Sequence, residues 1–317
     1  MTGSPKAPTI VFMGTPEFAV PSLQLLAASK HSVIAVVTGP PKPTGRGRRL
    51  QPTPVQLAAE ALDIPVVTVQ DLKDPEFLDI YQGLKPDVTA VVAFRILPPA
   101  LLQVPTRGTI NLHGSLLPKY RGAAPIQRAL MAGDTQTGLT TFLIDKRVDT
   151  GGMLARNIVD IHPDETFGDL SERMSEVGAE LLNRTILQYF NDELTPQPQD
   201  DSQATGAPKI KPDDFPIDWS ASAYHIHCQV RGLSPIPGAT TKLGDTPVKI
   251  LRSRLATEEQ PSGNPGSVLL AHPKQGLVVQ CGAGQLEILE LMKAGKKATS
   301  GKQFVGGRQI KQFDQLT

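Results

Sequence analysis

Short apolar runs alternate with amphipathic segments over the first 190 residues. The runs are rich in Val and Ile and stop at Gly, Pro or polar residues, which is typical of strands buried on both faces. We expect such strands at Thr9–Met13, Ser32–Thr38, Pro65–Val69, Asp87–Phe94 and Gly138–Ile144. Apolar residues between them recur at helical spacing and predict helices at Pro16–Leu26, Val55–Leu62, Asp74–Leu84 and Pro125–Met131. Strands that alternate with helices predict a doubly wound parallel sheet, of the Rossmann-like α/β class.

A long helix is expected after residue 166. Thr166-Phe-Gly-Asp169 has the form of a capping box with Asp in the Glu position. Apolar residues then follow at helical spacing, at Phe167, Leu170, Met174, Val177 and Leu181. This stripe predicts a helix that packs on the sheet, so Met174 needs no functional role.

The second half of the chain has a different pattern. Residues 191–207 are polar and proline-containing without apolar periodicity, and we interpret them as a linker between a domain at 1–190 and a domain at 208–317. The second domain begins with a predicted helix at Ser222–Arg231. Short strands then recur between glycine-rich turns, at Pro247–Leu251, Ser267–Ala271, Gly276–Cys281 and Gln285–Leu291. This spacing predicts a small, OB-like β-barrel.

Length and composition agree with this division. A chain of 317 residues is long for one core, so two domains are expected. The longest apolar stretch, Val88–Leu102, is interrupted by Arg95 and two prolines, so we expect no membrane span. Two cysteines far apart in sequence form neither a disulfide framework nor a metal-site spacing, which fits a reducing cytoplasm.

One strand carries polar residues that packing does not explain. Along Gly108–His113, side chains alternate faces, so Asn111 and His113 share one face and Ile110 and Leu112 the other. Gly114 ends the strand, which places the polar pair at its carboxyl end, where open α/β sheets bind ligands. An amide and an imidazole can stabilise an oxyanion or move a proton, but a buried Asn–His pair can also simply satisfy itself. Asp149, before Thr-Gly-Gly, could orient the histidine or merely start a turn.

A basic loop follows the second strand. Residues 39–50 carry four cations and no carboxylate, and their Gly and Pro content predicts an irregular structure. Arg46, Arg48 and Arg49 beside flexible glycines suit contact with a phosphate backbone, although a basic loop is often only solvated surface. The net charge of +1 does not decide between these readings. From residue 293 onward there are six Lys or Arg and one Asp, which gives the predicted barrel a basic edge.

Together these segments resemble a known family. Asn111-x-His113 with Gly-Ser-Leu-Leu-Pro118, Arg121-Gly-Ala-Ala-Pro125 and Asp149-Thr-Gly resembles the signature segments of the formyltetrahydrofolate-dependent formyltransferases. The resemblance runs from Phe12 nearly to the C-terminus, and several motifs occur in the family's order and spacing. It is greatest to the members that act on methionyl-tRNA.

The resemblance implies roles for these residues. Asn111, His113 and Asp149 would be the catalytic set, and Ser115, Leu116, Leu117 and Pro118 would hold the folate. The loop with Arg46, Arg48 and Arg49 would lie against the acceptor end of initiator tRNA. The implied reaction transfers a formyl group from 10-formyltetrahydrofolate to the α-amine of methionyl-initiator tRNA, with no metal. A monomeric, cytoplasmic enzyme of bacterial or organellar type is expected.

Among the departures from the family's usual pattern, which include Pro41 and Gly206, two lie near the expected site. Arg95 stands where the family has a glycine after an aromatic residue, beside the expected folate pocket. Arg147 stands two residues before Asp149, where glycine is common. If the turn needs a positive φ at that position, Arg147 is strained.

Other functions fit less well. A dinucleotide oxidoreductase needs further glycines after Gly14 that are absent. His225, His227 and Cys228 share a predicted helix, but His227 points away from His225 and no further ligand set is nearby, so a metal site is not expected. A formyltransferase or formyltetrahydrofolate hydrolase with a small-molecule acceptor, and a non-catalytic nucleic-acid adaptor, remain alternatives.

Overall fold

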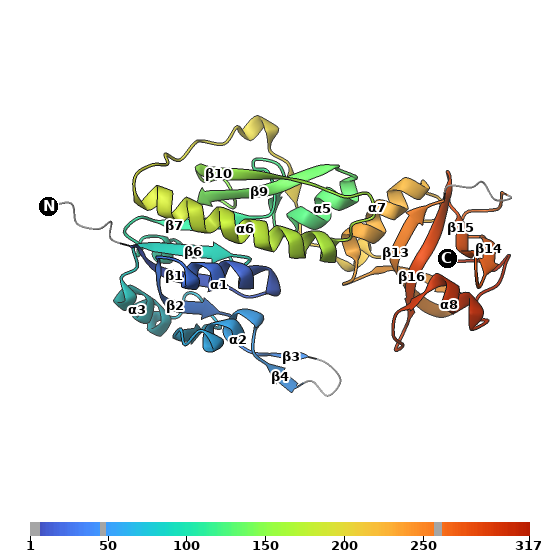
Figure 1. Cartoon of the computed structure of the whole chain (residues 1–317), viewed down its shortest axis with the longest axis horizontal. Helices are drawn as coiled ribbons and strands as arrows, with labels where there is room; N and C mark the ends of the chain where they lie inside the picture. The colour runs from blue at the N-terminus through green and yellow to red at the C-terminus, as the bar shows by residue number, and fades with distance from the viewer. Residues whose placement is uncertain (1–6, 45–48, 257–261) are drawn as a thin grey trace. The chain divides into compact units, whose positions relative to one another are not determined.

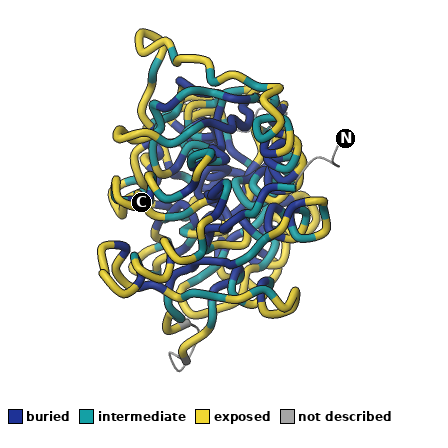
Figure 2. The backbone as a smooth tube through the Cα atoms, turned by 90° about the vertical axis from the view of Figure 1, so that its left-hand side faces the viewer, coloured by how far each residue is buried: buried dark blue, intermediate teal, exposed yellow. Residues whose placement is uncertain are grey.

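The computed structural model describes residues 7–44, 49–256 and 262–317 (Figure 1). The chain divides into two compact units that interleave in sequence. The first unit comprises Met1–Gly122, Gly138–Val159 and Ser171–Gly206, and the second comprises Ala123–Thr137, Asp160–Leu170 and Ala207–Thr317. Buried residues gather in the interior of the backbone trace, whereas its outermost turns are exposed (Figure 2). In the described ranges, no helix has both the length and the apolar character needed to cross a membrane.

The first unit is built on one mixed sheet with the order β10-β9-β7-β6-β1-β2-β5. Its strands are β1 (Thr9–Gly14), β2 (Ser32–Thr38), β5 (Val66–Thr68), β6 (Val88–Val92), β7 (Thr109–His113), β9 (Gln136–Leu143) and β10 (Met153–Asp160). The pairs β7–β6, β6–β1, β1–β2 and β2–β5 are all parallel. The loops after β2, β6 and β7 therefore leave the sheet at one edge, its carboxyl edge.

Helices connect these strands, as the apolar periodicity predicts. They are η1 (Glu17–Ala19), α1 (Val20–Ala28), α2 (Pro54–Ala61), α3 (Pro75–Leu84), α4 (Pro99–Leu102) and α6 (Phe167–Phe190). The side chain of Thr53 caps α2 and that of Asp74 caps α3, each with proline at the first helical position. The predicted capping box of α6 is confirmed, because Thr166 Oγ1 accepts from Asp169 N and Asp169 Oδ2 accepts from Thr166 N.

Helices cover the two faces of the sheet. One face, with Val11, Val37 and Val91, packs against residues of α3 and α4 such as Tyr81 and Leu101. On the other face lies α6: a Cβ at Gly178 would come within 2.8 Å of Leu112 Cδ2, and Thr185 Oγ1 lies 3.0 Å from Thr141 Oγ1. The predicted doubly wound architecture is thus confirmed. It also leaves Asn111 and His113 on the face opposite α6.

Two expectations about this unit are wrong. Residues 39–50 are not wholly irregular, since β3 (Lys42–Thr44) pairs with β4 (Arg49–Gln51) in an antiparallel ribbon that extends from the sheet (Figure 1). A two-stranded ribbon tolerates Pro43, because half of its N–H groups face solvent. The sheet is also not purely parallel. β9 pairs antiparallel with β7, and β10, which the periodicity did not predict, returns beside β9.

The second unit contains a six-stranded antiparallel sheet. Its path is β12-β13-β16-β15-β14, with β17 beside β16. The strands are β12 (Ala239–Leu243), β13 (Thr246–Leu255), β14 (Val268–His272), β15 (Gly276–Gln280), β16 (Gln285–Lys293) and β17 (Thr299–Ser300). The helices of this unit are α5 (Pro125–Ala132), η3 (Pro212–Asp214), α7 (Ala223–Leu233) and α8 (Gly301–Gly306). Two short pieces remain: β8 (Arg121–Gly122), which pairs with β11 (Gly206–Ala207), and η2 (Asp201–Gln203).

The segment 313–317 joins the two edge strands of this sheet. Lys242 on β12 exchanges two backbone hydrogen bonds with Thr317, and Val268 on β14 exchanges two with Phe313 and Asp314. Bridges at Leu243–Leu316 and Ser267–Gln315 continue the contact. The sheet thereby closes into the predicted small barrel.

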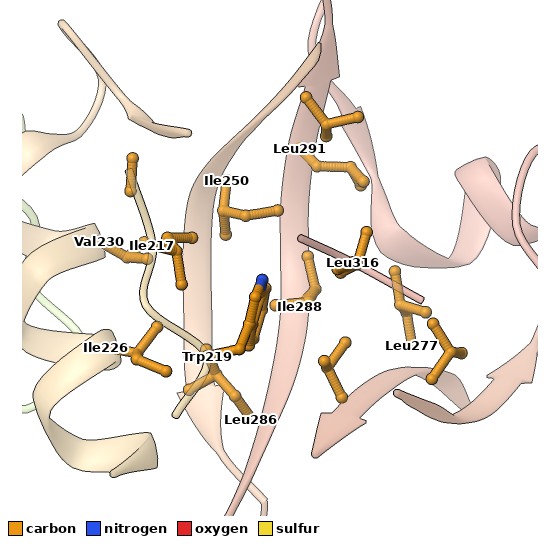
Figure 3. Packing of buried hydrophobic residues seen from close by; sticks show 14 of the residues in the cluster. Ile217, Trp219, Ile226, Val230, Ile250, Leu277, Leu286, Ile288, Leu291 and Leu316 are labelled. Atoms are coloured by element: carbon orange, nitrogen blue, oxygen red, sulfur yellow. The ribbon is translucent and has the colours of Figure 1, made fainter. Parts of the chain in front are cut away.

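The barrel encloses an apolar core centred on Trp219. Figure 3 shows Ile226 and Val230 of α7 gathered with Ile250 of β13 and Ile288 of β16 around this indole. The indole Nε1 donates to Thr241 Oγ1 at 3.0 Å, so its polar atom is satisfied inside the core. Leu316 contributes to the same cluster and is only 3% exposed.

The His and Cys residues of α7 have structural partners. His227 is buried, its Nδ1 lies 3.0 Å from Ser253 Oγ and its Nε2 lies 3.1 Å from Pro163 O. Burial is the main cause that lowers the pKa of His227. Cys228 and Cys281 are unpaired and buried, and burial raises the pKa of Cys281 to about 12. Within the described parts of the chain, no group of three or more His, Cys, Asp or Glu could hold a metal ion.

The closing segment can be tested with the chain's single tryptophan. Leu316→Ala removes a buried side chain from the barrel core, so we expect the free energy of unfolding of the second unit to fall by about 2–5 kcal/mol. Phe313→Ala is the matched control, because Phe313 is 82% exposed, and should change stability by less than about 0.5 kcal/mol. Trp219 fluorescence during denaturant unfolding measures both. Equal, small losses would show that the segment does not belong to the barrel core.

Candidate active site

The candidate site lies at the carboxyl end of β7. Asn111 pairs with Phe142 and His113 with Thr140 across the β7–β9 ladder, and Asn111 is also next to Val91 of β6. His113 is 6% exposed and meets Phe142 edge-on, with ring centroids 6.4 Å apart. The alternation that makes β7 a strand therefore places both polar side chains on one face. Packing against Phe142 limits the positions open to the imidazole ring.

Asp149 approaches this strand from the turn between β9 and β10. Its Oδ2 lies 3.7 Å from His113 Nδ1 and accepts a hydrogen bond of 2.8 Å from Gly122 N. The carboxylate is about 15% exposed. The structure thus brings together His113 and Asp149, which are 36 positions apart in the sequence.

The hydrogen bonds of His113 determine which nitrogen is reactive. Nε2 lies 2.9 Å from the carbonyl oxygen of Tyr120. A carbonyl only accepts, so Nε2 carries a hydrogen in every protonation state. Nδ1 is therefore the atom that gains or loses a proton, and it faces Asp149. At 3.7 Å the pair is longer than a direct hydrogen bond, so both atoms can accept from a donor placed against them.

Asn111 supplies an amide beside this pair. It lies two residues before His113 on the same strand face and is half-buried. Among the residues that the structure describes, none hydrogen-bonds its side chain, so the amide N–H can donate to a substrate oxygen. An amide donor, an imidazole and a carboxylate in one place can stabilise an oxyanion and remove a proton.

The segment Ser115–Pro118 forms a tight turn after β7. Ser115 Oγ donates to Lys119 O at 2.6 Å, and Thr140 Oγ1 both donates to Ser115 O and accepts from Leu117 N. Ser115 and Leu117 are fully buried and Pro118 is buried. Leu116 is the more accessible member, and its side chain lines a cavity of 560 Å³ with residues of β10 such as Met153 and Ile158.

The two departures near the expected site have local explanations. Arg95 donates to Val69 O and Gln70 O at 2.8 Å, and burial is the main cause that lowers its pKa. The condition for strain at Arg147 is not met, because the positive φ in this turn is at Asp149, where it is 55°. Arg147 instead lies in a turn where its N–H donates to Asp145 Oδ1.

Sequence reasoning missed three contributors to the site. Tyr120 receives the His113 Nε2 hydrogen through its carbonyl, and Gly122 holds the Asp149 carboxylate through its N–H. Gln199 donates to the carbonyls of Asp149 and Gly151. Two of these act through backbone atoms, which any residue type provides. Gln199 lies in the segment interpreted as a linker, where polarity alone gave no signal.

The predicted tRNA contacts cannot be placed completely. Arg46 and Arg48 lie outside the described residues, and only the backbone of Arg49, in β4, is described. The two arms of the ribbon, β3 and β4, follow β2, so they leave the sheet at the same carboxyl edge as the turn after His113.

Comparisons with known proteins agree over the whole chain. The sequence pattern of the family described as "Formyl transferase" matches residues 8–186, and "Formyl transferase, C-terminal domain" matches residues 209–309. The chain is 45% identical to the methionyl-tRNA formyltransferase of Trichlorobacter lovleyi over 302 residues, covering 95% of this chain and 94% of that protein. Identity to the methionyl-tRNA formyltransferase of Roseobacter denitrificans is 46%, covering 95% and 96%.

A solved structure shares the fold. HypX from Aquifex aeolicus in complex with tetrahydrofolic acid superposes with a TM-score of 0.65 at 17% identity, covering 97% of this chain and 50% of that chain. At this identity the likeness concerns the fold, and it extends across both units.

The neighbouring residues Leu116 and Leu117 differ in burial, so substitutions at the two positions should differ in their effect on stability. Leu117 is fully buried, so Leu117→Ala should lower the free energy of unfolding by about 2–5 kcal/mol. Leu116 lines the cavity, so Leu116→Ala should cost about 1 kcal/mol or less. Denaturant unfolding followed by circular dichroism measures both variants. A loss at Leu116 equal to that at Leu117 would contradict the assigned orientations.

Proposed function

This chain belongs to the formyl transferase family, and from that premise we propose that it transfers the formyl group of 10-formyltetrahydrofolate to the α-amine of methionyl-initiator tRNA. The observation that carries the proposal is the identity of 45–46% to proteins named methionyl-tRNA formyltransferase over about 95% of the chain. That similarity includes the barrel as well as the α/β unit, which favours a tRNA acceptor over a small molecule. Incubation with 10-formyltetrahydrofolate and charged initiator tRNA, followed by detection of N-formylmethionine, tests it.

The side chains at the end of β7 can perform this transfer. An α-amine has a pKa of about 7.7–8.0, so a usable fraction is neutral near pH 7. Its nitrogen attacks the formyl carbon, and the carbonyl oxygen becomes an oxyanion. The Asn111 amide donates to this oxyanion, and so does Nδ1 of His113 once it holds the proton that the attacking nitrogen releases. The bond between the formyl carbon and N10 of the folate then breaks, and N10 takes up the proton that the amine released.

The geometry of His113 and Asp149 supports a role for both in removing the amine proton. Nδ1 of neutral His113 and Oδ2 of Asp149 are acceptors 3.7 Å apart that face each other. An ammonium or amine placed against them can donate to both. The proton that leaves the nitrogen then resides on this pair, where the imidazolium that forms is next to a carboxylate.

The folate and tRNA sites are assigned to the neighbouring loops. We assign Ser115–Pro118 to the folate because this turn starts directly after His113. The buried Ser115 and Leu117 would fix the turn's shape, and the backbone and Leu116 would make the contacts. We assign the loop with Arg46, Arg48 and Arg49 to tRNA phosphates because it leaves the same sheet edge. Acting on initiator tRNA implies a cytoplasmic location or a bacterial-type organelle, and we expect a monomer.

Removal of the proposed catalytic groups should affect turnover much more than binding. His113→Ala and Asp149→Asn should each lower kcat by about 10²–10³-fold, because both groups act on the transition state, with tRNA affinity little changed. Asp145→Asn is the matched control. Asp145 is exposed in the same loop, and an amide oxygen can still accept from Arg147 N and Thr150 Oγ1. Near-normal kcat for either site variant would remove that residue from the catalytic set.

The basic loop can be tested through salt dependence. Each arginine that neutralises a tRNA phosphate contributes about 0.7–0.9 to the slope of log affinity against log salt. Replacement of Arg46, Arg48 and Arg49 by Gln should therefore flatten the slope by about two to three units. Lys30→Gln with Lys85→Gln is the control, because both residues are exposed at the opposite, amino edge of the sheet. If the slope changes by the same amount per removed charge in the loop variant and in the control, the loop does not bind tRNA phosphates.

A further inference from the structure

We propose that Gln199 is a positioning residue for formyl transfer, which holds the backbone turn that presents Asp149 to His113. The inference rests on the proposed function, because it concerns the same reaction. It assigns a specific task to a residue within the polar segment 191–207, whose sequence predicts only a connection between domains.

The amide of Gln199 has one possible orientation. Its Oε1 accepts from Arg121 Nε at 3.0 Å and from Arg121 Nη2 at 2.7 Å. Its Nε2 donates to Asp149 O and to Gly151 O, both at 2.9 Å. A guanidinium only donates and carbonyls only accept, so the oxygen must face Arg121 and the nitrogen the turn. Both hydrogens and both lone pairs of the amide are used.

Asp149 needs such a partner because its backbone is strained. With φ of 55°, it occupies the left-handed region that residues other than Gly seldom adopt, and such conformations persist only where surrounding contacts fix them. The turn is also packed closely on β9, since a Cβ on Gly151 would lie 1.7 Å from Leu143 O. Gln199 fixes the two carbonyls on either side of Thr150, and these bonds hold the turn in the conformation that aims the carboxylate.

Three consecutive residues link this clamp to the catalytic groups. Tyr120 O receives the Nε2 hydrogen of His113, the Arg121 side chain holds Gln199, and Gly122 N holds the Asp149 carboxylate. Residues 120–122 therefore contact His113 directly, through Tyr120 O. They also hold the Asp149 turn from two sides, through Gly122 N and through the Arg121 side chain by way of Gln199. A shift of Gln199 would release one side of the turn and change the position of the Asp149 carboxylate relative to His113 Nδ1.

Gln199 is itself held on both sides along the chain. Gln197 exchanges two backbone hydrogen bonds of 2.8 Å with Met153, and Asp201 Oδ1 accepts from Arg121 Nη2 at 2.7 Å. Thr205 accepts from Tyr120 N through Oγ1 and from Arg121 N through its carbonyl. The segment is thus fixed along the site, and it presents Gln199 at a set position.

The proposal predicts a loss of kcat without a loss of binding. Gln199→Glu keeps the size and the acceptor for Arg121 but places an oxygen against two carbonyls, and Gln199→Ala removes the clamp. Each should lower kcat about 10–100-fold while KM for folate and tRNA stays within about twofold, because displacement of a reacting group acts on the transition state. Gln203→Glu and Gln203→Ala are matched controls in the same segment and should retain kcat, because Gln203 is exposed and its side chain donates to Asp200 Oδ2, away from the Asp149 turn.

A double-mutant cycle shows whether Gln199 acts through Asp149. In an Asp149→Asn background, Gln199→Ala should lower kcat by less than about twofold more, because the group that it positions is already lost. A loss of kcat in the double variant equal to the product of the two single-variant factors would overturn the proposal. So would a fall in melting temperature that accounts for the lost activity, or a change confined to KM.

Hydrogen exchange separates this inference from the proposed function. Backbone amides of residues 145–153 should exchange faster in Gln199→Ala than in the wild type, and at the wild-type rate in Gln203→Ala. A wild-type protein that does not formylate methionyl-tRNA would refute the function and leave this measurement intact. Unchanged protection in Gln199→Ala would refute the clamp whichever acceptor the enzyme uses.

Discussion

The hydrogen bond from Gly122 N to the Asp149 carboxylate joins two loops that leave the sheet after different strands. One loop follows β7, which ends at His113, and the other connects β9 to β10. A carboxylate this little exposed costs free energy unless donors satisfy it, and an N–H with a fixed direction does so without side-chain entropy. The proposed chemistry depends on this bond, because it keeps the charge of Asp149 facing Nδ1 of His113 when no substrate is bound.

Features that depend on a short stretch of sequence were predicted correctly. Alternation along Thr109–His113 was enough to place Asn111 and His113 on one face, and Thr166 with Asp169 was enough to start α6. The return of β10 beside β9 was not predicted, because its sequence mixes apolar and polar residues and lacks a continuous apolar run; of its residues, Leu154 and Val159 are buried. The ribbon of β3 and β4 was not predicted because turn-forming residues dominate its sequence, and pairing across the ribbon overrides their propensity.

The proposed catalytic residues could be chosen from the sequence because polar side chains are unusual at the strand positions of Asn111 and His113, whereas the residues that position them could not. Gln199 is one polar residue among many in its segment, and its partners Asp149 and Arg121 are 50 and 78 positions away. The sequence likewise did not indicate that Asp149 is the residue of its turn with a positive φ. Which residue of a turn adopts the left-handed conformation depends on contacts from distant segments, and a single sequence does not display them.

In the barrel, a short segment limits strand pairing with other protein molecules. Open sheets expose rows of unpaired N–H and C=O groups along their outermost strands, and these rows can template pairing between molecules. Here residues 313–317 form backbone hydrogen bonds with Lys242 on β12 and with Val268 on β14. The same five residues that complete the fold therefore cover unpaired backbone groups on both edge strands. Damage to them, for example by proteolytic trimming, would convert a self-contained domain into one prone to intermolecular β-sheet formation and aggregation.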